Sequence, residues 1–257
     1  MRSVAYCLGL FLSLSLLVAC SDDSNPPAAD KPVAAQDTGS ADVYPDLGTL
    51  PDIGTKAPCE SEWIDAVGAV AKVSTGSVQS TDKGSGVTET TIDATAGGIN
   101  AAKSNPYVYV SLKDGSRVDV SDVDAKKSSA WDIAIRRSVI RINGGDSGAG
   151  QGGVAILAGK TLDQVTAVPP SVDFHADEFI DDSCQVSYDP INNILTAFGG
   201  QTGLWYDYEV GSGKLTPLAQ AYVIRLADGQ THVKLVIDSY YSPGNTSAFY
   251  TVRWSKL

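Results

Sequence analysis

A glycine-bounded motif in the middle of the chain has the residue types of a covalent catalyst. Gly145-Asp146-Ser147-Gly148 imitates the nucleophile loop of serine proteases, where an activated hydroxyl attacks a carbonyl carbon. In the trypsin-like chain order the histidine and aspartate precede the serine, whereas His175 and His232 both follow it. A nucleophile elbow would need glycine where Ala149 stands. We therefore expect a structural turn here and no enzymatic activity.

Two further motifs imitate phosphate-binding loops. Residues 148–153 satisfy the pattern G-x-G-x-x-G, and Gly159-Lys160-Thr161 resembles the end of a phosphate loop. A dinucleotide site needs a helix after its glycines, but the apolar run 154–157 is typical of a strand. The second motif lacks its first glycine, because Val154 holds that position. We expect turn glycines that use positive φ angles, at Gly144, Gly145, Gly148, Gly150, Gly152 and Gly153.

Metal ligation has little support in the residue pattern. Metal sites need clustered ligands, and the two histidines lie far apart in the sequence. Asp119, Asp122 and Asp124 are better explained by a solvated acidic turn than by a calcium loop, whose spacing they do not follow. We expect no metal site built from these side chains.

The N-terminus has the pattern of an export signal. Arg2 precedes an apolar run, residues 4–18, that is shorter than the roughly 20 residues needed to span a bilayer. Leu17-Val18-Ala19-Cys20 resembles the lipobox of bacterial lipoproteins, in which the cysteine is acylated and becomes the mature N-terminus. We expect an outer-membrane lipoprotein held by a lipid on Cys20; a plain secretory signal cut elsewhere is the alternative.

Composition divides the rest of the chain into a tether and one domain. Residues 20–58 are rich in Pro, Ala, Asp, Ser and Gly and cannot bury a core, which predicts a disordered tether. Residues 59–257 have the length of a single domain. The formal net charge of -11 repels phosphate backbones, so nucleic acid is not an expected partner.

The cysteines predict one disulfide in that domain. Cys7 would leave with the signal peptide, residues 1–19, and Cys20 would carry the lipid. Cys59 and Cys184 remain, and two cysteines in an exported chain favour a bond between them. Two separate free thiols are the alternative.

Strand signals dominate the domain and predict an all-β fold. Residues 107–112 and 117–120 flank the turn Lys113-Asp114-Gly115-Ser116, and residues 222–226 and 233–237 flank Asp228-Gly229. Residues 249–254 alternate aromatic and polar side chains as a last strand. Helix signals are few: residues 160–168 could form two turns before Pro169, and residues 61–73 fit helix or strand equally.

One alternating stretch predicts an irregular strand. From Trp131 to Arg136 apolar and polar side chains alternate, as a half-buried strand requires. The alternation slips before Ile140 and Ile142, which predicts a β-bulge near Arg137.

Several blocks in fixed order resemble the HmuY family. They are Trp131–Arg137, Arg141–Gly148, Gly150–Gly153, Gly159–Thr161 with Asp163-Gln164 and Val168-Pro169, Trp205, Tyr222–Gly229, Lys234 and Asp238–Tyr241. The resemblance covers about residues 87–256. It implies an all-β lipoprotein of many short antiparallel strands, the best-known members of which bind haem for iron acquisition and pass it to a TonB-dependent outer-membrane receptor.

The resemblance also locates the residues expected to contact haem. One axial histidine of the family falls where this chain has Val210, and the other lies in the segment that here contains His175. Arg136 replaces a family histidine after the Trp-Asp block. Trp205 and neighbouring tyrosines offer aromatic walls, and Tyr206 or Tyr208 could supply a phenolate ligand instead.

Two functional hypotheses follow from these observations. In one, the domain binds and scavenges haem, with His175, Tyr206 or Tyr208 as the axial ligand. In the other, haem ligation has been lost, and the same lipoprotein binds a different ligand, a protein or a glycan without catalysis.

Overall fold

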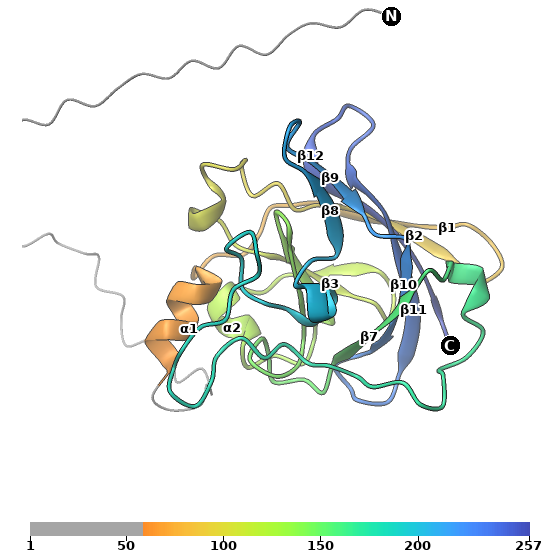
Figure 1. Ribbon diagram of the computed structural model, residues 1–257, viewed down its shortest axis with the longest axis horizontal. Coiled ribbons are helices and arrows are strands. Elements are labelled where there is room, and N and C mark those ends of the chain that lie inside the picture. Colours follow the sequence, from red (N-terminus) through yellow and green to blue (C-terminus); the bar gives the residue numbers. More distant parts are fainter. Residues whose placement is uncertain (1–58) are drawn as a thin grey trace, which may run out of the picture. The chain divides into compact units, whose positions relative to one another are not determined.

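Antiparallel strands are the main regular structure of residues 59–257, the part of the chain that the computed structural model describes (Figure 1). The predicted signal peptide, the lipidated Cys20 and the tether lie outside the described residues. The helices are α1 (Glu60–Val67) and α2 (Asp122–Ala125), with 3-10 turns η1 (Ala102–Ser104), η2 (Leu162–Gln164) and η3 (Ala197–Thr202). The strands are β1 (Val78–Asp82), β2 (Thr88–Asp93), β3 (Val108–Ser111), β4 (Ser116–Val118), β5 (Ile133–Arg136), β6 (Val139–Ile142), β7 (Gly153–Ala158), β8 (Tyr206–Glu209), β9 (Lys214–Pro217), β10 (Gln220–Arg225), β11 (His232–Tyr241) and β12 (Ser247–Lys256).

The strands form three sheets in which every neighbouring pair is antiparallel. The largest has the order β1-β2-β12-β11-β10-β7, the second has β4-β3-β5-β6, and β8 pairs with β9 alone. Both hairpins predicted from Asp-Gly turns are present, β3–β4 and β10–β11. The all-β fold class expected from the sequence is therefore confirmed.

Side-chain alternation along β3 and β5 separates two cores. Val108, Val110, Ile133 and Ile135 face the large sheet, where they pack with side chains of β10, β11 and β12. Tyr109 and Ala134, one residue out of phase, pack instead in a second core with α1 and the 179–194 segment. The prediction of a half-buried strand at 131–136 is therefore wrong, because β5 is buried on both faces.

The predicted bulge near Arg137 is a tight turn. β5 and β6 form a hairpin in which Arg136 pairs with Val139, so Arg137 and Ser138 form the connection. Arg137 has φ of 52°, a left-handed conformation that costs energy for a residue with a side chain. The break in the apolar–polar alternation before Ile140 therefore reflects the reversal of the chain between β5 and β6.

Two other local predictions also differ from the structure. Residues 160–168 form only the single 3-10 turn η2, which ends at Gln164, well before Pro169. Asp122, expected in a solvated turn, is fully buried and accepts hydrogen bonds from the amides of Val70 and Tyr107 and from the Tyr109 hydroxyl. Burial raises the pKa of its carboxyl.

The glycine-rich loop is shaped mainly by close packing. Of the six glycines expected at positive φ, only Gly145 has one, so that prediction is wrong for the other five. A Cβ added at Gly148 would lie 2.1 Å from the Asn143 side-chain oxygen, and one at Gly152 would lie 2.5 Å from the Asn143 carbonyl. The glycines are needed because their neighbours leave no room for a side chain.

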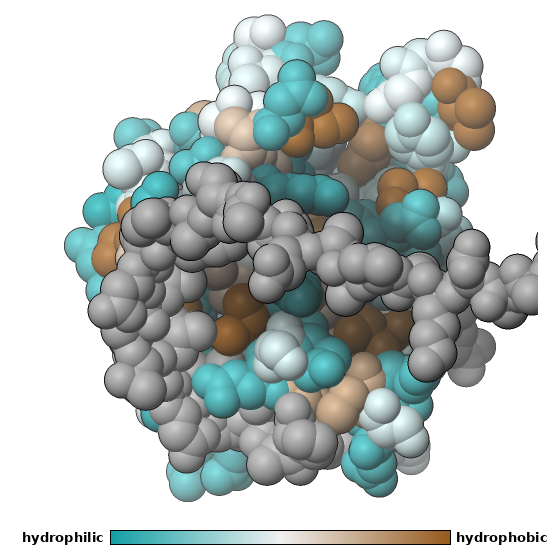
Figure 2. Space-filling model, turned by 90° about the vertical axis from the view of Figure 1, so that its left-hand side faces the viewer, coloured by the Kyte–Doolittle hydropathy of each residue, from teal (hydrophilic) through white to brown (hydrophobic). Residues whose placement is uncertain are grey.

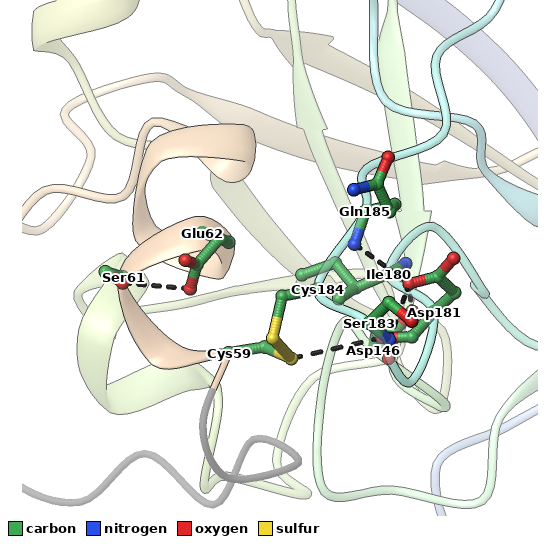
Figure 3. The surroundings of a disulfide bond; sticks show 9 residues. All are labelled: Cys59, Ser61, Glu62, Asp146, Ile180, Asp181, Ser183, Cys184 and Gln185. Atoms are coloured by element: carbon green, nitrogen blue, oxygen red, sulfur yellow. Dashed lines mark hydrogen bonds between the residues drawn. A yellow bond between two sulfur atoms is a disulfide. The ribbon is translucent and has the colours of Figure 1, made fainter.

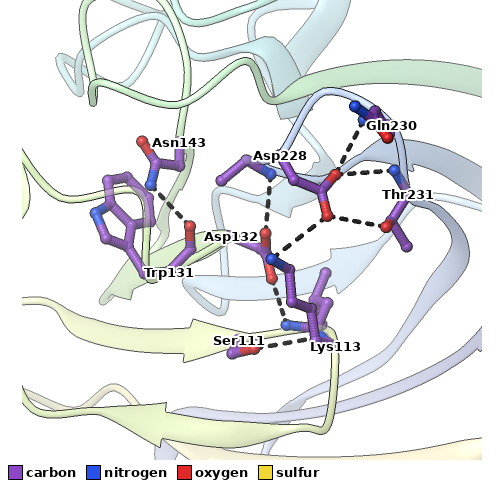
Figure 4. Close-up of polar contacts among 10 residues, drawn as sticks. Ser111, Lys113, Trp131, Asp132, Asn143, Asp228, Gln230 and Thr231 are labelled. Carbon is purple, nitrogen blue, oxygen red and sulfur yellow. Dashed lines mark hydrogen bonds and ion pairs between the residues drawn. The ribbon is translucent and has the colours of Figure 1, made fainter.

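A buried carboxylate joins the two large sheets (Figure 4). Asp132 accepts hydrogen bonds from the Leu112 amide at the end of β3, at 2.7 Å, and from the Ala227 amide after β10, at 2.9 Å. Burial raises the pKa of this carboxyl. In the neighbouring turn, Asp228 accepts from the amides of Gln230 and Thr231 and pairs with Lys113.

Replacing this carboxylate should destabilise the domain strongly. Asp132→Ala leaves two buried amides without acceptors, and each costs about 1–3 kcal/mol of unfolding free energy. The matched control, Asp119→Ala, removes an exposed ion pair with Arg117 and should cost less than about 1 kcal/mol. Urea unfolding measures both, and equal losses would contradict the assignment.

Candidate ligand-binding cavity

A cavity of about 770 Å³ lies where the ends of several elements meet. Its walls come from the end of α1, the segment around η1, the β5–β6 turn, the 188–194 loop and the β8–β9 hairpin. The volume falls within the range of small-molecule sites in proteins, roughly 300–1,000 Å³. Six tyrosines line it: Tyr107, Tyr188, Tyr206, Tyr208, Tyr240 and Tyr241.

Large hydrophobic side chains are exposed around this cavity. Four cavity-lining residues are unusually exposed for their type: Ile99 (77%), Tyr188 (54%), Tyr208 (42%) and Ile191 (40%). On the side of the molecule that carries α1, hydrophobic surface lies recessed among hydrophilic side chains (Figure 2). Clustered exposed apolar residues mark binding surfaces in soluble proteins, so the cavity is the best candidate site in the described part of the chain.

Arg136, predicted as a ligand contact, lies at the cavity wall but serves the fold. Its guanidinium donates to the carbonyls of Gly68 (2.8 Å) and Asn105 (3.2 Å) and to the Val67 carbonyl. It also lies 4.2 Å from the centre of the Tyr107 ring. These bonds satisfy the terminal carbonyls of α1, a site where positive charge is favourable.

The expected disulfide between Cys59 and Cys184 is present and links two cavity walls (Figure 3). Cys59 directly precedes α1, whose last turn lines the cavity with Asp65 and Ala66. Cys184 lies in the irregular segment that continues into the 188–194 wall. The bond joins residues 125 apart in sequence, with their Cα atoms 5.2 Å apart.

Burial makes two of the cavity phenols harder to ionise. Burial, reinforced by the charge of Asp189, raises the pKa of Tyr206 to about 12, and burial also raises that of Tyr240. The Tyr241 hydroxyl accepts a hydrogen bond from the Leu215 amide. Among the described residues no hydrogen bond engages the hydroxyls of Tyr188 and Tyr208, which leaves them available to a ligand.

Trp205 and His175, the remaining predicted contacts, do not line the cavity. Trp205 is buried behind it, where its ring contacts Tyr206, Tyr240 and Tyr250 and its indole nitrogen donates to the Ser138 carbonyl. His175 forms a bridge with Val154 of β7, and its side chain is mostly exposed. Trp205 therefore supports the tyrosine wall, while His175 belongs to another part of the surface.

Sequence reasoning missed several cavity residues, three of which show why. Tyr188 and Ile99 lie in segments without secondary-structure signals, and Lys103 lies in the short turn η1. Exposed aromatic or aliphatic residues in polar loops were the available signal, but many such residues are merely scattered surface side chains. Only the fold brings these three to one place.

The protease-like motif is a structural element. Ser147 is completely buried; its hydroxyl donates to the Asp177 carboxylate at 2.5 Å and accepts from Arg141 at 3.0 Å. Asp146 accepts from the amides of Phe179 and Ile180. The motif therefore holds the 177–180 segment, and its serine is not available as a nucleophile.

Residues 59–257 offer neither a cluster of metal ligands nor a membrane-spanning helix. They contain no group of three or more His, Cys, Asp or Glu side chains placed to hold a metal ion. None of the helices in this range has the length and apolar character to cross a bilayer.

An all-β domain with an open, aromatic-lined cavity has the features of a ligand-binding protein. The sequence profile of the HmuY protein family matches residues 103–254, more than half of the chain. The chain belongs to the HmuY family. No curated protein sequence matches it.

Several solved structures match the chain at low sequence identity. A lipoprotein of Bacteroides fragilis is 18% identical with a TM-score of 0.46, the match covering 68% of this chain and 92% of that one. An HmuY-like haem-binding protein of Bacteroides vulgatus is 17% identical (TM-score 0.45; 69% and 96% covered). The apo HmuY analogue of Tannerella forsythia is also 17% identical (TM-score 0.43; 72% and 97% covered).

Breaking the disulfide should loosen the cavity before the sheets. Cys184→Ser should lower the unfolding free energy by about 2–5 kcal/mol, as loss of a long-range disulfide does. Amide hydrogen exchange should accelerate in α1 and in residues 184–194 while β10 and β11 stay protected. Uniform acceleration would contradict a local role.

Asp177 should make stability depend on pH. Burial raises the pKa of its carboxyl to about 6, although Ser147 and the amides of Ala197 and Ile142 donate to it. Between the ordinary value of 3.8 and about 6 the folded chain holds a proton that the unfolded chain has lost, so its stabilising contribution falls as pH rises.

Asp177→Asn should remove this dependence because the amide stays neutral. The unfolding free energy of the wild type, relative to the variant, should fall as pH rises through that window. Urea titrations at four pH values between 4 and 7 measure the difference. A constant difference would show that Asp177 does not titrate there.

Proposed function

We propose that this chain is a non-catalytic lipoprotein that binds haem or a closely related tetrapyrrole in the cavity between α1 and the β8–β9 hairpin. The observation that carries the proposal is the combination of cavity volume and six lining tyrosines with exposed hydrophobic residues at the rim. A flat, largely apolar ring buries its faces against such walls. Membership of the HmuY family supports the same class of ligand.

Export and anchoring complete the proposal. Residues 1–19 would direct secretion, and a lipid on Cys20 would hold the protein at the outer membrane. The segment of residues 20–58 would then separate the domain from the membrane. A TonB-dependent receptor is the proposed recipient of the bound haem.

Tyr208 is the proposed axial ligand when the ring carries iron. No histidine, methionine or cysteine is among the described residues that line the cavity, so phenol oxygen is the available strong donor. Tyr206 is costly to ionise because burial raises its pKa to about 12. Tyr208 is half-exposed on β8, and its hydroxyl forms no hydrogen bond within the described residues, so its oxygen is accessible to a ligand.

Haemin added to the purified protein should produce a saturable Soret shift with a high-spin spectrum. Tyr208→Phe should weaken binding about tenfold and change the spectrum, because the coordinating oxygen is lost. Tyr206→Phe should have a smaller effect. His175→Ala is the matched control, since this imidazole lies outside the cavity, and it should change nothing.

The outcomes separate the parts of the proposal. No saturable shift would overturn haem binding. A shift abolished by His175→Ala alone would place the ligand elsewhere on the domain. If none of the three substitutions alters haemin binding, Tyr208 is not the axial ligand.

A second candidate is an aromatic ligand without iron. It is favoured by the absence of imidazole, thioether and thiol groups among the described cavity residues. In that case metal-free protoporphyrin should bind as tightly as haemin, and Tyr208→Phe should affect both equally.

A further inference from the structure

The cavity is positively charged in an acidic protein. Among the described residues, its lining includes Lys103, Arg136 and Arg137 but only one carboxylate, that of Asp65. The whole chain has 30 acidic against 19 basic residues and a formal net charge of -11. Because the rest of the chain is acidic, an anionic ligand is attracted to this cavity in preference to other parts of the surface.

Two of these three cations remain available to a ligand. Arg136 is committed to the carbonyls of Val67, Gly68 and Asn105. Lys103 is exposed on η1, and neither it nor Arg137 forms an ion pair with any carboxylate in the described part of the chain. Both charges therefore lack a counter-ion within residues 59–257.

Arg137 is held beside the cavity by its backbone and one neighbour. Within residues 59–257 its guanidinium donates hydrogen bonds only to Ser247, at 3.1 Å to the hydroxyl and 3.4 Å to the carbonyl, although it has five N–H groups. Its carbonyl accepts from the Tyr250 hydroxyl at 2.7 Å. Arg137 has φ of 52°, a backbone conformation that glycine adopts at lower energetic cost. This turn position therefore holds a guanidinium cation in a fixed place.

We propose that Lys103 and Arg137 pair with carboxylate groups of the ligand, so that the cavity selects a carboxylate-bearing tetrapyrrole over a neutral one. This inference rests on the proposed function and names the substrate class of the same site. Charge-assisted hydrogen bonds from guanidinium and ammonium groups to carboxylates are short and strong. They add selectivity that aromatic walls alone do not provide.

Metal-free protoporphyrin IX and its dimethyl ester form the test pair, because they share the ring and differ in the two carboxylates. The purified protein should bind the diacid about tenfold more tightly than the ester. Added salt should weaken binding of the diacid and leave the ester unchanged, because salt screens exposed charges. Porphyrin fluorescence gives both dissociation constants.

Single substitutions then locate the effect. Lys103→Gln and Arg137→Gly should each weaken binding of the diacid about three- to tenfold and leave the ester unchanged. Arg137→Gly keeps the left-handed turn, because glycine readily adopts positive φ. Arg137→Lys keeps the positive charge and should bind the diacid with nearly wild-type affinity. Lys72→Gln removes an exposed lysine that does not line the cavity and should change nothing.

The results distinguish failure of this inference from failure of the proposed function. Equal affinity for diacid and ester, unaffected by Lys103→Gln and Arg137→Gly, would overturn charge selection while leaving ring binding intact. Failure to bind haemin and both porphyrins would overturn the proposed function and this inference together.

Discussion

The buried guanidinium of Arg136 holds the cavity together. It comes from the end of β5, stacks on Tyr107 and takes up the last carbonyls of α1 and the carbonyl of Asn105. These groups belong to three separate walls, and no continuous strand or helix joins them. Without this side chain, the last carbonyls of α1 would lose the hydrogen bonds from the guanidinium. The Cys59–Cys184 bond would then connect residues 184–194 to a helix with a less stable C-terminal end.

In the wall formed by residues 177–197, side-chain carboxylates accept the backbone hydrogen bonds that a neighbouring strand would accept in a sheet. Residues 177–197 have almost no regular structure, yet their backbone amides need acceptors. Asp177 accepts from Ala197, Asp146 accepts from Phe179 and Ile180, and Asp189 accepts from the amides of Ile191 and Asn193. A loop fixed in this way can carry exposed Tyr188 and Ile191 at a defined place beside a cavity.

The sequence was sufficient for the fold class and the hairpins because alternation and Asp-Gly turns are local signals. The resemblance in the central blocks likewise identified the family. It could not show that Arg136 is a helix cap, because its partners at 67, 68 and 105 are distant in sequence. The exposed phenol of Tyr188 was missed because its segment carries no secondary-structure signal and only the fold brings it to the cavity. Asp122 was taken for a solvated residue because its three hydrogen-bond donors are distant in sequence.

A crystal structure of the protein grown with haemin tests the central claim most directly, because it locates the ring. The account predicts the ring between the 188–194 loop and the β8–β9 hairpin, against Tyr188 and Tyr208, with its carboxylates toward Lys103 and Arg137. A ring bound elsewhere, for example at His175 beside β7, would contradict it.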